Sequence, residues 1–163
     1  NLPDAAVKTS ARSELVMEMA GNLNDSTQIS GTAFSDLKKK QVSAGQIRLN
    51  YHDQKQRILN LGYSQRKGEY EAAQLAFATP VTKQWTLVGA YEQDLKNDRN
   101  LETLAGLEYQ SCCWKSRIAA RKYLLSDNAT YDDALFVELE LKGLGSFGSG
   151  TRNLMENRIY GYE

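Results

Sequence analysis

The sequence has little from which a metal site, a nucleic-acid interface or a helical membrane anchor could be built. Its 163 residues include one histidine, His52, and two cysteines, so no ligand set for a metal exists and neither a metal nor another cofactor is expected. Lys and Arg number 20, as do Asp and Glu, and this balance argues against a nucleic-acid partner. No run approaches the roughly 20 apolar residues of a spanning helix, which excludes a helical membrane protein.

Apolar residues instead recur at every second position along most of the chain, which is the period of a β-strand. Residues typical of turns separate the alternating runs, and the pattern predicts about nine strands of ~9–12 residues, with a weaker one near residues 27–34. The predicted turns lie at residues 21–25, 35–40, 52–55, 66–68, 79–80, 95–100, 111–112 and 126–130. The strongest alternation sets Leu135, Val137, Leu139 and Leu141 against Phe136, Glu138, Glu140 and Lys142.

Strand length distinguishes two all-β classes. Strands of soluble proteins average about 5–6 residues, whereas a tilted strand needs ~9–11 residues to cross a bilayer. Long alternating strands joined by short turns therefore predict the antiparallel strands of a transmembrane β-barrel. A soluble β-sandwich remains the alternative on length alone.

The two faces of the predicted strands differ in chemistry. One face carries aliphatic side chains, with aromatic rings near both rims, as in the girdles of a membrane barrel. The other carries mixed charge, as expected of solvated side chains that face a water-filled lumen. The charged residues of the lumen-facing side are Glu102, Glu108, Lys115, Arg117, Arg121, Glu138, Glu140 and Lys142.

Successive hairpins alternate between the two membrane faces, so the turns fall into two sets. The set that contains residues 111–113 is the shorter. In outer-membrane barrels the short turns face the periplasm, which places the cysteines and the C-terminus in that oxidising compartment.

Cys112 and Cys113 are adjacent, and a disulfide between adjacent residues would close a strained ring. Two periplasmic thiols without a third cysteine in the chain imply partners on another segment or another chain. Two small buried thiols remain the alternative on residue chemistry alone.

The two ends of the chain do not resemble those of a complete small barrel. The sequence begins without Met, and residues 143–150 are too rich in glycine for another spanning strand. A mixed polar tail follows, whereas most small barrels end on their final strand. We therefore expect a C-terminal fragment of a larger barrel with three parts: an N-terminal segment (residues 1–11), transmembrane strands (12–143) and a periplasmic tail (144–163).

One string of residues is more specific than the alternation. Leu107-Glu108-Tyr109-Gln110-Ser111-Cys112-Cys113-Trp114, followed by the run 137–144 and by Gly148-Ser149-Gly150-Thr151, resembles the C-terminal end of the LptD family of outer-membrane lipopolysaccharide transport proteins. The resemblance covers residues ~101–155 well, whereas residues 12–94 fit any large barrel.

The resemblance implies the outer membrane of a Gram-negative bacterium, a barrel of roughly 26 strands and a periplasmic β-jellyroll domain. It also implies several partners: lipopolysaccharide, membrane lipid, a lipoprotein plug called LptE, the N-terminal part of the same transporter and, during folding, the barrel-assembly machinery. Cys112 and Cys113 would each pair with a cysteine of the N-terminal periplasmic part. Leu135, Val137, Leu139 and Leu141 would belong to the last strand, at a lateral gate for the lipid.

Two other functions remain as alternatives to a lipopolysaccharide translocon. A complete small outer-membrane barrel that serves as an anchor or adhesin is the first, and a soluble β-sandwich is the second. An enzyme is not expected. His52 lies in a turn, and Glu138 and Glu140 lie two positions apart on one strand face, as expected of solvated side chains in the lumen.

Overall fold

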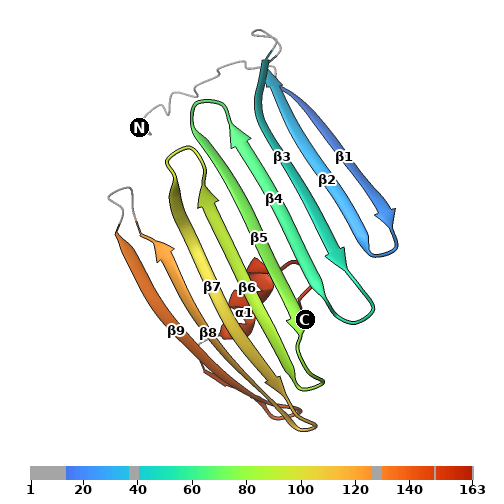
Figure 1. Cartoon of the computed structure of the whole chain (residues 1–163), viewed down its shortest axis with the longest axis vertical. Coiled ribbons are helices and arrows are strands. Elements are labelled where there is room, and N and C mark those ends of the chain that lie inside the picture. The colour runs from blue at the N-terminus through green and yellow to red at the C-terminus, as the bar shows by residue number, and fades with distance from the viewer. Residues whose placement is uncertain (1–13, 37–40, 126–129, 149, 163) are drawn as a thin grey trace, which may run out of the picture.

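A computed structural model describes residues 14–36, 41–125, 130–148 and 150–162. The predicted segment 1–11, and most of the predicted turns at 35–40 and 126–130, lie outside this part. The described strands form one antiparallel sheet in chain order (Figure 1). The nine long strands are β1 (Glu14–Asn24), β2 (Thr27–Asp36), β3 (Gln41–His52), β4 (Ile58–Arg66), β5 (Tyr70–Pro80), β6 (Trp85–Asp94), β7 (Arg99–Gln110), β8 (Trp114–Leu124) and β9 (Tyr131–Leu141).

These strands confirm the predicted all-β class and the expected number of long strands. They contain between 9 residues, in β4, and 12 residues, in β3 and β7, as membrane-crossing strands require. Among the described strands β1 pairs only with β2, so they form an open sheet, as expected of one portion of a barrel. A sandwich would need a second sheet, which the described residues do not form.

No helix within the described ranges has the length and apolar character needed to cross a lipid bilayer.

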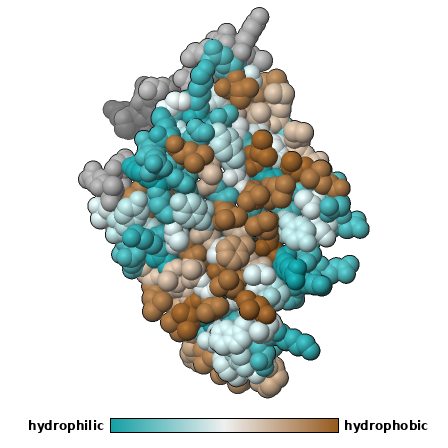
Figure 2. Space-filling model, in the orientation of Figure 1, coloured by the Kyte–Doolittle hydropathy of each residue, from teal (hydrophilic) through white to brown (hydrophobic). Residues whose placement is uncertain are grey.

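Cross-strand register keeps the two faces chemically distinct. On the face that we call outer, one row across the last three long strands consists of Leu107, Ile118 and Val137. The adjacent row on the opposite, inner face consists of Glu108, Arg117 and Glu138. Figure 2 shows hydrophobic residues running down the middle of the face in view, with hydrophilic residues along its margins.

Aromatic rings pack against one another near the rim that carries the cysteines. The ring of Tyr109 lies 4.9 Å from that of Trp85 and 4.9 Å from that of Trp114, and both pairs are tilted. Such contacts tie β6, β7 and β8 together at one end of the sheet, in the position expected of a girdle.

The residues after β9 fold back onto the sheet. A short strand, β10 (Gly145–Gly148), pairs with β9, and a helix, α1 (Thr151–Arg158), lies against the inner face. Thr151, Met155 and Ile159 are fully buried, and the last two pack in a cluster with Ile58, Ala76, Ala78, Val88, Ala119 and Tyr162. The mixed polar tail expected from the sequence is thus packed against the sheet through one narrow stripe that recurs every four residues.

Two glycines let the chain pass from the sheet edge to the inner face. Gly148 has φ 137° and Gly150 has φ 69°, conformations that other L-residues rarely adopt. A Cβ atom on Gly148 would overlap the carbonyl oxygen of Val137 on β9, so only glycine fits this close approach.

Candidate functional site

The edge strand β9 is paired differently along its two sides. Along one side it pairs with β8 over its full length, from Leu124 opposite Tyr131 to Trp114 opposite Leu141. Along the other side β10 covers only residues 138–141, and no described strand pairs with residues 131–136. The outer row of β9 stays open, with Leu135 70% exposed, Val137 50% and Leu139 41%, whereas Leu141 is half-buried.

A cluster of charged side chains lies on the inner face beside this edge. Arg117, which is 1% exposed, donates from Nε to Glu108 Oε2 at 2.7 Å. Its Nη1 donates to Glu138 Oε1 at 3.0 Å and to Glu140 Oε2 at 2.9 Å. Lys115 adds a longer contact of 3.9 Å with Glu108. One guanidinium therefore joins carboxylates from β7 and β9 across β8.

The C-terminal segment, which consists of β10, α1 and the residues that follow α1 up to Tyr162, covers this cluster. The hydroxyl of Tyr162 donates to Glu108 Oε2 at 2.6 Å, and the backbone N–H of Arg152 donates to Glu138 Oε2 at 2.9 Å. Glu108 and Glu138 are only 5% and 4% exposed as a result. The expectation that these charges are solvated is therefore wrong for Glu108, Arg117 and Glu138, because the tail replaces water above them.

Two further candidate residues of the inner face lie outside this cluster. Arg121 bonds Glu102 at 2.8 Å, and Arg158 of α1 reaches the same carboxylate oxygen at 2.5 Å. Lys142 follows β9, is exposed, and donates to the carbonyl oxygen of Ser111 in the cysteine turn at 3.0 Å. Thus Glu102 is shared by Arg121 of β8 and Arg158 of α1, whereas Lys142 joins the end of β9 to the turn.

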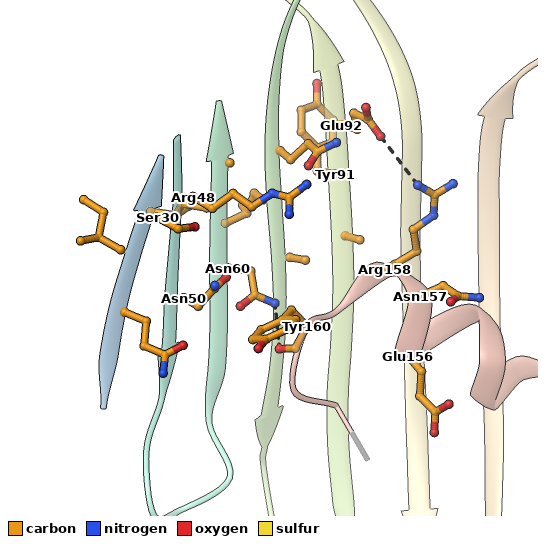
Figure 3. A pocket seen from close by; sticks show the side chains of 18 of the residues that line it. Ser30, Arg48, Asn50, Asn60, Tyr91, Glu92, Glu156, Asn157, Arg158 and Tyr160 are labelled. Carbon is orange, nitrogen blue, oxygen red and sulfur yellow. Dashed lines mark hydrogen bonds and ion pairs between the residues drawn. The ribbon is translucent and has the colours of Figure 1, made fainter. Parts of the chain in front are cut away.

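A polar groove separates the inner face of the earlier strands from the end of α1 (Figure 3). It has a volume of about 710 Å³. Arg158 lies 3.9 Å from Glu92 across it, and Asn60 donates to the carbonyl oxygen of Tyr160 at 3.1 Å. Arg48 points into the same space from β3. Sequence reasoning missed this groove, because it forms only when residues 156–160 return to strands about 54 to 140 positions earlier.

Cys112 and Cys113 lie in the turn between β7 and β8, and both are exposed. Their sulfur atoms are 2.7 Å apart. This contact lowers the pKa of the Cys112 thiol and raises the pKa of the Cys113 thiol. Exposure excludes the alternative of two buried thiols and leaves both sulfurs accessible to partners from outside the described residues.

Comparison with known proteins supports the class that the fold indicates, a portion of an outer-membrane β-barrel. The family model LptD, "LPS transport system D", matches residues 2–94. The LPS-assembly protein LptD of Nitrosococcus oceani is 33% identical over 161 residues, which cover 99% of this chain and 22% of that protein. The LptD protein of Marinobacter nauticus is 34% identical over 155 residues, which cover 94% of this chain and 19% of that protein. The LptD protein of Alcanivorax borkumensis is 40% identical over 87 residues, which cover 51% of this chain and 12% of that protein.

The chain therefore belongs to the LptD family. It spans about a fifth of the length of the curated relatives that it matches over nearly its whole extent. The family model covers the earlier strands, where the alternation alone was unspecific, and so extends the likeness beyond the cysteine string.

Proposed function

We propose that this chain is the C-terminal part of the barrel wall of a translocon that inserts lipopolysaccharide into the outer leaflet of the outer membrane. Membership of the LptD family supports this role, and the edge of β9 is the observation that carries it. Residues 131–136 present a backbone edge that no described strand pairs. An unpaired backbone group in hydrocarbon costs several kcal/mol, so this edge requires a strand from elsewhere in the barrel.

The first barrel strand is the proposed partner, and the seam between it and β9 is the proposed lateral gate. Leu135, Val137, Leu139 and Leu141 form the lipid-facing row of β9, the gate strand, which agrees with the exposure of the first three. The lumen wall includes the inner-face residues beside the gate strand, and their contacts keep β9 in place. These residues are Glu108, Arg117, Arg121, Glu138 and Glu140. The role is translocation without catalysis.

Further partners follow from the same proposal. Cys112 and Cys113 would each form a disulfide with the N-terminal periplasmic part, a pairing that their exposure on a turn supports. LptE would plug the lumen, and the barrel-assembly machinery would fold the strands into the membrane. The cysteine turn and the C-terminus are assigned to the periplasmic side.

A disulfide across the seam tests the function. Leu135→Cys, combined with a cysteine on the first strand of the full-length transporter, should cross-link and stop lipopolysaccharide export while the barrel stays folded. Export is followed by the appearance of lipopolysaccharide at the cell surface, and reduction of the disulfide should restore it. Ile118→Cys and Leu107→Cys are the matched controls. Both side chains lie on the outer face, but they belong to β8 and β7 and not to the edge strand, so they should not reach the first strand. Continued export through a fully cross-linked seam would refute the gate.

A further inference from the structure

The C-terminal segment and the edge of β9 are one structural unit. Gly145, Ser146, Phe147 and Gly148 of β10 pair with Leu141, Glu140, Leu139 and Glu138 of β9. The chain then turns over the edge at Gly148 and Gly150 and enters the inner face. The part of the edge next to the cysteine rim is therefore occupied by the chain's own continuation.

This occupation is firmly held. Thr151, Met155 and Ile159 have no exposed surface, and Tyr162 is 8% exposed. Three contacts bind the segment to inner-face carboxylates: Tyr162 to Glu108, the Arg152 N–H to Glu138, and Arg158 to Glu102. A segment that buries both an apolar stripe and polar contacts does not leave the sheet easily.

We propose that residues 145–148 and 150–162 form a fixed strap that covers residues 138–141 of β9 and limits the edge of β9 open to another strand to residues 131–136. The inference rests on the proposed function only in naming the first barrel strand as that other strand. An edge of six residues is roughly 20 Å long, against about 36 Å for all of β9.

The strap has a physical consequence for the seam. β8 and β9 are joined over 11 residue pairs, and a seam of that length would be as strong as any other in the wall. The strap pairs the backbone groups of residues 138–141 with those of β10 and so removes them from the seam, and β10 is then the last described strand of the sheet over that stretch. The seam that must open thus carries about half the ladder hydrogen bonds of an ordinary one.

Cysteine cross-linking in the full-length transporter tests the strap. Leu135→Cys and Leu139→Cys report on the two parts of the edge, because both side chains lie on the outer row. Each is combined with a series of cysteines along the first barrel strand. We expect disulfides with Leu135→Cys and at least tenfold lower yield with Leu139→Cys. Equal yields would overturn the strap. Failure at both positions would instead refute the proposed seam.

A second pair tests the strap without reference to the first strand. Phe147 lies directly opposite Leu139, so Phe147→Cys with Leu139→Cys should cross-link nearly completely in growing cells. A yield below about one half would show that the segment leaves β9 and is not fixed.

Gly148→Ala should release the strap, because the new Cβ overlaps the Val137 carbonyl oxygen. Gly145→Ala is the matched control: its φ is 131°, close to that of Gly148, but its Cβ would meet nothing within 4 Å. We expect Gly148→Ala to lower the Phe147–Leu139 yield several-fold and to raise the Leu139–first strand yield, with a smaller change for Gly145→Ala. Identical yields in the two variants would contradict the close approach on which the strap depends.

Discussion

Replacement of Arg117 should loosen the C-terminal segment more than any replacement of an exposed charge. Arg117 is 1% exposed and bonds three carboxylates, two of which also bind the segment. Arg117→Met keeps much of the side-chain volume but leaves Glu108, Glu138 and Glu140 without their shared cation. Removal of one partner from a buried ion pair costs ~3–5 kcal/mol.

That cost applies only while the segment is closed, because detachment lets water reach the carboxylates. The equilibrium between the closed and the open segment should therefore shift toward the open state by up to the same ~3–5 kcal/mol. A shift of ~3 kcal/mol raises the equilibrium constant for opening by a factor of more than ~100. Lys115, at 3.9 Å from Glu108, compensates part of the lost charge and places the expected shift at the lower end.

Thiol labelling measures this opening. Thr151 is fully buried and its hydroxyl has no hydrogen-bond partner, so Thr151→Cys is a reporter of small cost. In the full-length transporter, Arg117→Met should raise the rate of Thr151→Cys labelling by about a hundredfold, after subtraction of the labelling seen without the reporter. Arg66→Met is the control, because Arg66 and Glu69 form an exposed pair worth ~0–1 kcal/mol. A rate within threefold of that control would refute the reasoning.

Three further predictions use other contacts. Tyr162→Phe removes one hydrogen bond to a charged group, worth ~1.5–3 kcal/mol, and should raise Thr151→Cys labelling at least tenfold, with unchanged labelling as the contrary result. Burial and the bond to Glu108 raise the pKa of the Tyr162 hydroxyl, so the stabilisation of the closed segment by Tyr162 is present below pH ~10 and is lost as the pH rises above that value. Thr151→Cys labelling should therefore accelerate above pH ~10 when Tyr162 is present, and should accelerate less when Tyr162→Phe is added. Cys112→Ser with Cys113→Ser should change the mobility of the full-length protein on non-reducing gels, with a smaller change for either single variant, and unchanged mobility would remove the proposed interdomain disulfides.

The strands could be predicted from the sequence because one short-range signal specifies them. Ile47, Leu49 and Tyr51 alternate with polar residues, and lipid on one face against polar surroundings on the other requires that period of two. The outer row of β9 was predictable in the same way.

The C-terminal segment was harder to predict. Its helix has only 8 residues, and four glycines between residues 143 and 150 indicate irregular chain. The spacing of Thr151, Met155 and Ile159 was the available signal, but a single stripe of three residues does not say which surface it meets. The burial of Glu108, Arg117 and Glu138 could not be read from their own strands, because it depends on residues 14 to 54 positions away.

The buried charges also connect strand register to the position of the segment. A slip of β9 by one residue against β8 would turn Glu138 and Glu140 toward lipid and bring an aliphatic residue opposite Arg117. The carboxylate that receives the Arg152 N–H would then be absent from the inner face, and α1 would lose its contact with β9. A buried ion pair adds little stability compared with apolar packing of equal volume, so the cluster is better explained by specificity than by strength. We therefore expect the C-terminal segment to dock fully only on a sheet whose last three long strands are in register, so that the strap closes a correctly assembled edge.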